Sequence, residues 1–352
     1  MDKVKIEIAG RTISSSHPPY VIAELSANHS GSYERALKII DEAANAGADA
    51  IKLQTYKPDT ITLDSDSEEF KIEGGLWDGR TLYDLYEEAH TPWDWHKPLF
   101  EHASAKGITI FSSPFDTTAV DLLEDLNAPA YKIASFEAID LPLIRYVAST
   151  GKPIIISTGM AKMDEISEAI ESAKEAGCNE IAVLHCISSY PAPLEDCNLS
   201  TIKDMADRFG LVTGLSDHTL GPVAAISSVA LGASIVEKHF TLDRNGGGPD
   251  DSFSIEPDEL VQLCSSLKNA WLSIGAPDYK LKASEIENIK FRRSLYAVKP
   301  ILKGELITLE NVKSIRPGYG LAPKHLDSIL GKTASQNINR GQAISWALVG
   351  EQ

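Results

Sequence analysis

Two histidines in this 352-residue chain each stand at or just after the end of a short apolar run, where they could hold a metal ion. His218 and His239 provide imidazoles, and with oxygen donors nearby they suit a divalent cation such as Mn²⁺ or Mg²⁺. Two protein ligands without a third leave coordination positions open for substrate and water, as in catalytic rather than structural metal sites. We therefore predict that both residues are catalytic and metal-binding.

Lysines and serines at the ends of other apolar runs indicate a binding site for an anion. Lysine provides positive charge for a phosphate or carboxylate, and serine hydroxyls provide hydrogen-bond donors. No G-x-x-x-x-G-K-[ST] sequence is present, so a nucleoside triphosphate is not indicated. The expected anion cradle comprises Lys52, Ser113, Lys132, Ser135, Ser157 and Ser216.

Buried strands must hold these residues in place. Short runs of continuously apolar sequence are typical of strands that are buried on both faces. Eight such runs occur: Tyr20–Leu25, Ala50–Thr55, Thr109–Ser113, Ala130–Ser135, Pro153–Thr158, Ile181–Cys186, Val212–Ser216 and Ile235–Phe240.

Amphipathic stretches with helical spacing separate most of these runs. Tyr33–Ala46, Met163–Ala176 and Val223–Leu231 each precede a glycine, which is the expected stop of a helix. Eight strand–helix units over about 250 residues predict an α/β fold, the (β/α)8 TIM barrel. An open doubly wound sheet is the alternative, although no G-x-G-x-x-G follows the first run.

In a barrel the carboxyl ends of all strands surround one pocket, which is where active sites lie. Each polar run-end residue alone could be a surface cation or a hydrogen-bonded core residue. Their joint pattern favours a catalytic site formed by Glu24, Lys52, Ser113, Lys132, Ser135, Ser157, His185, Ser216, His218, Glu237 and His239.

A long segment between Thr55 and Thr109 interrupts the strand–helix rhythm. It leaves from the end of the second run and is therefore expected at the active-site face of a barrel. Its aromatic residues in Leu76–Trp93 are expected to cover part of the pocket. The alternative is ordinary helix packing for Tyr83, Tyr86 and Trp93.

The composition divides the chain into a barrel at residues 1–275, a polar linker at 276–293 and a small β-rich module at 294–352. The module has short β runs, Ser294–Val298 and Leu306–Leu309, among glycine turns. Residues 283–352 carry 10 Lys and Arg against 6 Asp and Glu, although the whole chain has a net charge of −17. A basic module on an acidic body is expected to dock onto it.

Charge, apolar runs and cysteine spacing restrict the class of protein. A net charge of −17 argues against broad binding to nucleic acid. No apolar run reaches the ~20 residues of a membrane span, and Met1–Lys5 lack the apolar core of a secretory leader. The four cysteines show no C-x-x-C spacing, which favours free thiols in a reducing cytoplasm.

Several of these residues lie in runs that together resemble the sialic acid synthase family of nonulosonic acid synthases. The tail also resembles the antifreeze-like (SAF) module of that family, and Leu76–Trp93 looks most like pseudaminic acid synthases. The runs are Val21–His29, Ile51–Thr55, Tyr131–Ser135, Ser157–Met160, His185–Cys186 with Tyr190–Pro191, Gly214–Thr219, Glu237–Thr241 and Ser314–Gly320.

This resemblance implies a condensation of phosphoenolpyruvate with an open-chain amino sugar, 2,4-diacetamido-2,4,6-trideoxy-L-altropyranose, with release of phosphate by C–O cleavage. It assigns Glu24 a catalytic role. It implies sugar contacts for Gln54, Tyr190, Glu237, Asp250 and Arg316. Ser188 departs from many sialic acid synthases, which have asparagine there.

The resemblance further implies a domain-swapped homodimer in which Arg316 of one subunit reaches the site of the other. Three alternative acceptors remain: N-acetylmannosamine, which would give sialic acid; the diacetamido sugar that is the precursor of legionaminic acid; and an aldose phosphate. The aldose phosphate predicts an additional cation set, which the sequence does not contain. A non-enzymatic carbohydrate- or ice-binding protein is the remaining alternative.

Overall fold

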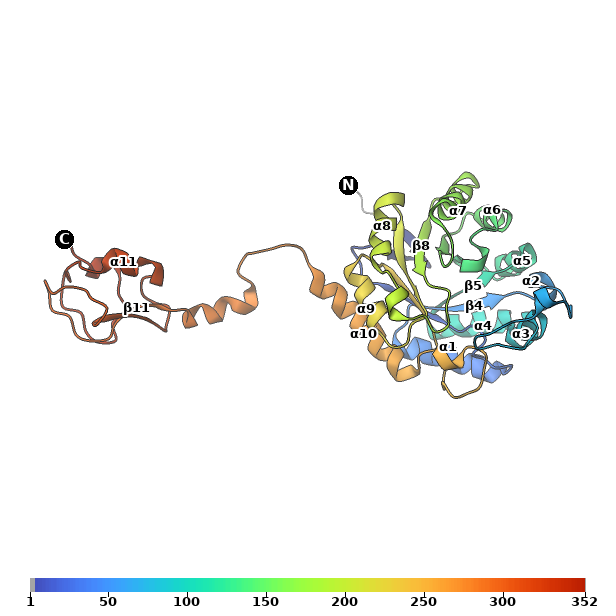
Figure 1. Ribbon diagram of the computed structural model, residues 1–352, viewed down its shortest axis with the longest axis horizontal. Coiled ribbons are helices and arrows are strands. Elements are labelled where there is room, and N and C mark those ends of the chain that lie inside the picture. Colours follow the sequence, from blue (N-terminus) through green and yellow to red (C-terminus); the bar gives the residue numbers. More distant parts are fainter. Residues whose placement is uncertain (1–3, 352) are drawn as a thin grey trace. The chain divides into compact units, whose positions relative to one another are not determined.

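The computed structural model describes residues 4–351, so Met1–Lys3 of the N-terminal segment considered above and Gln352 lie outside the described part. The chain divides into two compact units, Met1–Gly275 and Ala276–Gln352, each of which is described by itself. Figure 1 shows the first unit and labels its helices and several of its strands. None of the helices in the described residues is long and apolar enough to cross a membrane.

The first unit is a closed barrel of eight parallel strands, which confirms the predicted TIM barrel and rules out the open sheet. The strands neighbour one another in chain order, and the last pairs with the first. Their bounds are β3 Tyr20–Glu24, β4 Ala50–Thr55, β5 Thr109–Pro114, β6 Tyr131–Ile133, β7 Ile154–Ser157, β8 Ile181–Cys186, β9 Val212–Asp217 and β10 Ile235–His239.

Helices surround the strands, as the helical spacing predicted. Three predicted helices begin where expected, and their ends agree to within one residue. Gly47, which follows the first of them, has a φ of +83° and accepts the left-handed conformation that ends the helix. The helices are α1 Tyr33–Ala46, α4 Trp93–Lys106, α5 Thr117–Asp125, α6 Leu141–Ala148, α7 Met163–Glu175, α8 Ser200–Phe209, α9 Val223–Ala230 and α10 Pro257–Ile274.

A short hairpin closes the amino-terminal end of the barrel. Its strands are β1 Ile6–Ile8 and β2 Arg11–Ile13, which pair in antiparallel fashion. The isoleucines of the hairpin form one buried cluster with inward-facing residues of the barrel, among them Tyr20 and Phe111. The sequence analysis did not anticipate this plug, which leaves the opposite, carboxyl end as the open face.

Alternation along each strand determines which side chains face the interior. On β4, Ala50 belongs to the interior cluster, so Lys52 and Gln54 also point inward, whereas Ile51 and Leu53 pack outward against the helices. The same period of two places an apolar layer at the closed end and a polar layer at the open end.

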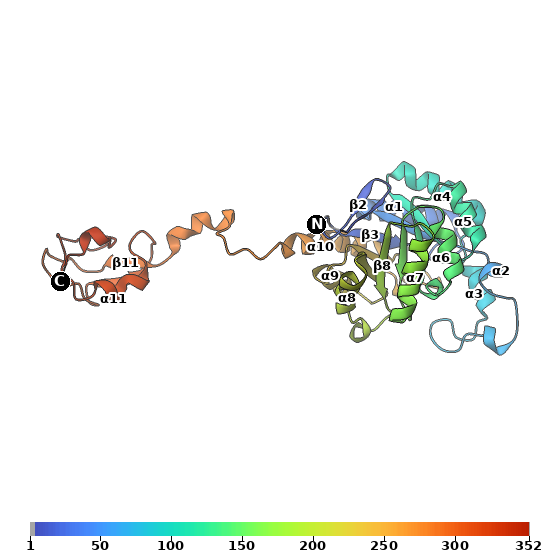
Figure 2. The same cartoon turned by 90° about the horizontal axis from the view of Figure 1, so that it is seen from above.

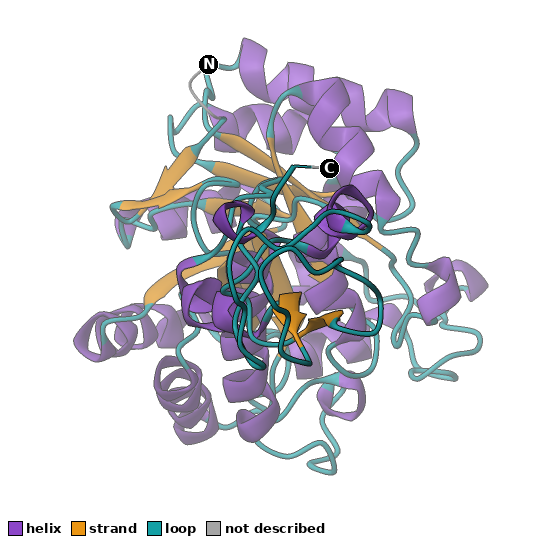
Figure 3. Cartoon of the chain, turned by 90° about the vertical axis from the view of Figure 1, so that its left-hand side faces the viewer, coloured by secondary structure: helices purple, strands orange, loops and turns teal. Residues whose placement is uncertain are grey.

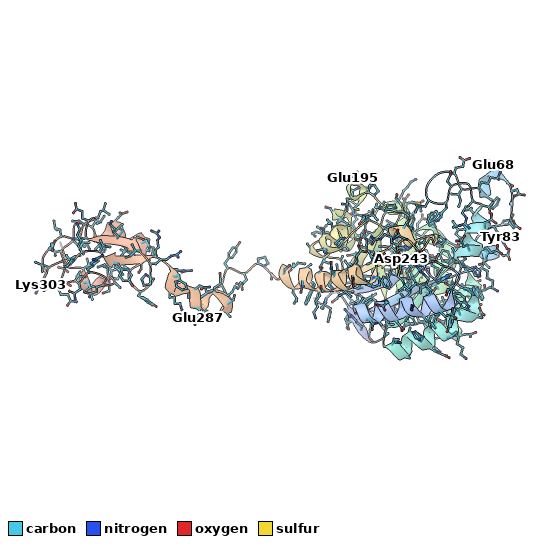
Figure 4. All side chains as sticks on the ribbon, turned by 90° about the horizontal axis from the view of Figure 1, so that it is seen from below. Glu68, Tyr83, Glu195, Asp243, Glu287 and Lys303 are labelled. Carbon is cyan, nitrogen blue, oxygen red and sulfur yellow. The ribbon has the colours of Figure 1, made fainter. Side chains whose placement is uncertain are left out.

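The insertion after β4 ends where α4 begins, so Trp93 belongs to a regular barrel helix. Within the insertion lie α2 Pro58–Ile61, a 3₁₀ turn at Glu68–Phe70 and α3 Leu82–Ala89. Figure 2 shows this segment in pale blue at the margin of the helical ring, and Figure 4 labels Glu68 and Tyr83 on it.

The second unit is small and consists mostly of loops and turns (Figure 3). Its strands β11 Ser294–Ala297 and β12 Val312–Ile315 pair in antiparallel fashion. The β run predicted at Leu306–Leu309 is not a strand and forms only an isolated bridge from Leu306 to Thr333. Short helical segments complete the unit: Ala283–Phe291, Pro323–His325, α11 Leu326–Ile329 and Trp346–Leu348.

Candidate active site

Two carboxylates and a lysine form the centre of the polar layer. Lys52 on β4 lies between Glu24 on β3 and Glu237 on β10, with Nζ–Oε distances of 3.0 and 3.4 Å. All three side chains are at most 5% exposed. Lys52 also donates to Ser113 Oγ at 3.4 Å. The ends of four strands thus converge on one buried charge cluster.

A second lysine extends this cluster to the other side of the barrel. Lys132 donates to Ser157 Oγ at 2.6 Å, and its Nζ lies 3.6 Å from Oε1 of Glu237. Ser216 donates to the same carboxylate oxygen at 3.0 Å. The predicted cradle is therefore not purely cationic, because Glu237 joins both lysines.

Burial and neighbouring charges shift the pKa values of the two carboxyl groups in opposite directions. Burial raises the pKa of Glu24 to about 7, although the Lys52 ammonium opposes this shift. Burial also acts on Glu237, but Lys132 and Lys52 outweigh it and hold the pKa of that carboxyl well below its ordinary value. Near neutral pH, Glu237 is therefore ionised and Glu24 can take up or release a proton.

A close approach of three loop residues adds donors beside Lys132. The backbone N–H of Gly159 donates to Ser135 Oγ at 3.1 Å. A Cβ added at Gly159 would collide with the hydroxyls of Ser188 and Ser135. Only glycine leaves room for both serines, so the loops after β6, β7 and β8 bring their hydroxyl and amide groups to one point.

The two histidines lie side by side at the open end of the barrel. Their ring centroids are 5.3 Å apart, and His218 Nδ1 lies 2.9 Å from the Ile187 carbonyl oxygen. If Nδ1 donates to that carbonyl, Nε2 of His218 is left as a ligand. His239 Nδ1 is buried without a hydrogen-bond partner and lies 3.9 Å from Asp250 Oδ2.

Residues predicted to contact the sugar surround this pair. The Tyr190 ring lies 4.4 Å from that of His218, measured between centroids. Gln54 Nε2 donates to Glu24 Oε1 and to Ser26 Oγ, each at 3.0 Å. Asp250, on the loop after β10, accepts a short hydrogen bond from Ser26.

One of the residues considered in the sequence analysis points away from this cluster, and another belongs to the second unit. His185 was expected in the pocket, but it alternates with the inward Leu184 and Cys186, and its Nε2 lies 2.6 Å from the Cys197 carbonyl oxygen on the outer face. Arg316 is an exposed residue of the second unit.

The structure also brings in residues that the sequence analysis missed. Cys186 faces inward, with Sγ 3.8 Å from His218 Nδ1. The Oε2 atom of Glu137 is buried without a partner, and burial raises the pKa of this carboxyl to about 7 while Lys132 opposes the shift. The inward parity of Cys186 was available from the strand pattern, whereas the placement of Glu137 depends on a 3₁₀ turn.

An aromatic residue of the insertion reaches the same site. Trp77 donates its indole N–H to the Pro249 carbonyl at 3.2 Å, and its ring centroid lies 6.0 Å from that of Tyr190. Tyr83 and Tyr86, in contrast, lie on α3, where the Tyr86 ring packs 5.6 Å from Tyr56. The part of the insertion that contacts the site is therefore the turn that carries Trp77.

Comparisons with known proteins agree with the two units of the fold. Residues 39–279 match the model of the NeuB family, and residues 292–350 match that of the SAF domain. A pseudaminic acid synthase of Campylobacter jejuni is 47% identical over 92% of this chain and 95% of its own length. A pseudaminic acid synthase of Helicobacter pylori is 42% identical over 93% and 97%. A crystal structure of N-acetylneuraminic acid synthetase from Leptospira borgpetersenii, in complex with citrate, aligns with a TM-score of 0.73 and 32% identity, covering 83% of this chain and 98% of that one.

Proposed function

The chain belongs to the NeuB family, and on this premise we propose that it acts as a pseudaminic acid synthase. The substrates are phosphoenolpyruvate, 2,4-diacetamido-2,4,6-trideoxy-L-altropyranose in its open-chain form, and water. C3 of phosphoenolpyruvate bonds to the aldehyde carbon of the sugar, and water adds to C2. The resulting tetrahedral centre loses phosphate by cleavage of the C2–O bond. The water gives up two protons in all: one goes to the aldehyde oxygen, and the second goes to the leaving phosphate as C2 becomes a ketone.

We assign phosphoenolpyruvate to the side of the barrel that carries Lys132. Its ammonium group and the hydroxyls of Ser135 and Ser157 can donate to phosphate and carboxylate oxygens, and the N–H of Gly159 holds Ser135 Oγ in place. Donors held in a buried site need no reorganisation as charge develops on the tetrahedral centre. Lys52 and Ser216 complete the proposed cradle through their contacts to the central carboxylates, and Ser113 through its hydrogen bond from Lys52.

Glu24 is the residue that we propose for proton transfer. Its carboxyl group is buried, and its pKa of about 7 allows it both to accept and to donate a proton near neutral pH. Gln54 and Lys52 hold the two carboxylate oxygens in place, at 3.0 Å each. Glu24 therefore suits the transfer of a proton between water and the sugar aldehyde.

His218 and His239 would hold the divalent cation, Mn²⁺ or Mg²⁺. The fit depends on their chemistry: Nδ1 of His239 is buried without a partner, and burial with the neighbouring His218 keeps the pKa of His239 far below its ordinary value, so the ring is neutral. Within residues 4–351, no group of three or more His, Cys, Asp and Glu is arranged to hold a metal, so further ligands would come from substrate and water. When bound, such a cation supplies Lewis-acid activation of a carbonyl.

We expect removal of the metal to abolish turnover while leaving the fold intact. Treatment with a chelator should stop phosphate release, and added Mn²⁺ or Mg²⁺ should restore it. His218→Ala and His239→Ala should be inactive in both conditions, with circular dichroism spectra like that of the unaltered protein. Full activity of both variants in the presence of chelator would refute the metal assignment.

We further propose that the functional unit is a domain-swapped homodimer in the cytoplasm. The second unit carries Arg316, whose planar guanidinium suits the amide carbonyl and hydroxyls of the acceptor sugar. All four cysteines are free thiols in the structure, in keeping with a reducing compartment. Tyr190, Gln54, Asp250 and Glu237 are the proposed sugar contacts from the barrel.

The observation that carries the proposed activity is the convergence of two buried lysines and two histidines at one barrel end. The test is phosphate release from phosphoenolpyruvate with a panel of acceptors: the 6-deoxy diacetamido sugar, N-acetylmannosamine, the legionaminic acid precursor and an aldose phosphate. We expect the 6-deoxy diacetamido sugar of altro configuration to give the highest kcat/KM. A higher kcat/KM with another acceptor would assign the protein to a different activity within the family. Absence of phosphate release with every acceptor would exclude a synthase.

A further inference from the structure

Ser26 combines a strained backbone with a buried hydroxyl at the edge of the site. It is 2% exposed, and its φ of +47° lies in the left-handed region that non-glycine residues rarely adopt. Such conformations persist only where the surrounding structure enforces them, and they occur often at functional sites. Glycine would adopt this backbone without strain, so the serine side chain itself requires an explanation.

The hydroxyl of Ser26 connects two of the proposed sugar contacts. It donates to Asp250 Oδ2, from a loop 224 residues away in sequence, and accepts from Gln54 Nε2 at 3.0 Å. The second Nε2 hydrogen of Gln54 goes to Glu24, also at 3.0 Å. Both amide hydrogens are therefore used, and the orientation of the amide leaves the Gln54 carbonyl oxygen as its remaining polar group.

Neighbouring contacts prevent the Ser26 loop from relaxing. Asn28 Nδ2 donates to the Phe240 carbonyl at 2.9 Å and to Ser254 Oγ at 2.8 Å. Arg35 Nε donates to the Asn28 carbonyl at 2.6 Å. The loop after β3 is thus attached to the segment after β10, the same segment that carries Asp250.

We propose that Ser26 is a positioning residue for the acceptor sugar, which fixes the Gln54 amide and the Asp250 carboxylate in the orientation that receives it. The inference rests on the proposed function, because it takes the acceptor sugar as the ligand of these two groups. Ser26 acts through its hydroxyl on Gln54 and Asp250, and phosphoenolpyruvate binds on the opposite, Lys132 side.

Two substitutions separate the hydroxyl from the backbone. Ser26→Ala removes the hydroxyl and keeps the strain, whereas Ser26→Gly removes both. We expect both variants to lose about 10- to 100-fold in kcat/KM for the acceptor, the range expected for loss of a hydrogen bond to a charged group. The KM for phosphoenolpyruvate should stay within about twofold. Ser26→Gly should melt at a higher temperature than Ser26→Ala.

The matched control is Ser30→Gly. Ser30 is a serine in the same loop with the same φ of +47°, but its side chain is exposed. This variant should gain stability and keep the kinetics of the unaltered protein.

An active protein in which Ser26→Ala and Ser26→Gly keep acceptor kinetics would overturn the inference. Normal acceptor kinetics in Ser26→Gly alongside a defect in Ser26→Ala would also overturn it, because the defect would then come from backbone strain and not from loss of the hydroxyl. Absence of phosphate release in the unaltered protein with every acceptor would instead refute the proposed function.

Discussion

At the scale of single residues, the site is a balance between two buried lysines and two buried carboxylates. Lys52 is held between Glu24 and Glu237, whereas Lys132 contacts only Glu237 among these carboxylates within ion-pair distance. Lys132 therefore has more of its charge available to an incoming anion. The two lysines should respond differently when each is replaced.

Lys132→Met keeps most of the side-chain stem and removes the charge. We expect the KM for phosphoenolpyruvate to rise about 10- to 100-fold, the loss expected for a charge-assisted hydrogen bond. For Lys52→Met we expect in addition a loss of about 3 kcal/mol in the free energy of unfolding. This variant leaves Glu24 and Glu237 buried without their shared partner. Steady-state kinetics and urea unfolding measure the two effects.

Lys162→Met is the control for these variants, since it changes the net charge equally at an exposed position just after β7. It should leave both measurements unaltered. Unchanged kinetics in both Lys52→Met and Lys132→Met would mean that these lysines only stabilise the strand ends.

Glu137 gives a prediction about pH. Its pKa rises from 4.5 to about 7 on folding, chiefly through burial, so the fold favours its protonated form. This group contributes stability below pH 4.5, and that contribution is lost as the pH rises through 7. As the pH rises from 4.5 to 8, the free energy of unfolding of Glu137→Gln should increase by about 1–2 kcal/mol relative to that of the unaltered protein, as measured by urea unfolding. The full shift corresponds to ~3 kcal/mol, but the side chain is partly exposed. A pH-independent difference would contradict the prediction.

At the scale of elements, we propose that the insertion after β4 contributes the wall of the pocket that distinguishes acceptors. Its contact with the site is made by Trp77, which is fixed to the Pro249 carbonyl and lies beside Tyr190. An aromatic wall can pack against the methyl group of a 6-deoxy sugar. It offers no partner to the hydroxyl that N-acetylmannosamine carries at the same carbon, which costs about 1–3 kcal/mol.

Trp77→Ala should therefore reduce the preference for the 6-deoxy acceptor over N-acetylmannosamine by about 10-fold or more. The measurement is the ratio of the two kcat/KM values. Trp271→Ala is the matched control. Trp271 lies on α10, and its indole N–H also donates to a backbone carbonyl, that of Ser15, at 3.2 Å. An equal ratio in all three proteins would remove the insertion from acceptor choice.

At the scale of the whole molecule, the barrel carries every described site residue except Arg316, which lies in the second unit. The proposed dimer supplies this arginine from the partner subunit. Arg316→Ala and His239→Ala should each be inactive as homodimers. A heterodimer of the two has one site with both residues intact, so activity should return to about a quarter to a half of normal. Verified heterodimers without activity would exclude the arrangement in trans.

Much of the barrel was predictable from sequence because strand burial and helix ends leave local patterns. Continuously apolar runs and glycines after helices located the strands and three helix ends, and polar run ends located Glu24, Lys52 and Lys132. These features depend on residues near one another in the chain. The chain by itself therefore determined the eight strands and most of the central charge cluster.

Tertiary structure decided what depends on register and on distant loops. His185 stands at a strand end like its neighbours, yet the pleat turns it outward. Gly159 and Ser188 come together only because β7 and β8 are adjacent. The bond from Ser26 to Asp250 joins segments 224 residues apart, and no local pattern encodes such a contact. Glu237 on β10 meets Lys52 on β4 only because the last strand pairs with the first, so closure of the barrel, rather than any local pattern, completes the site.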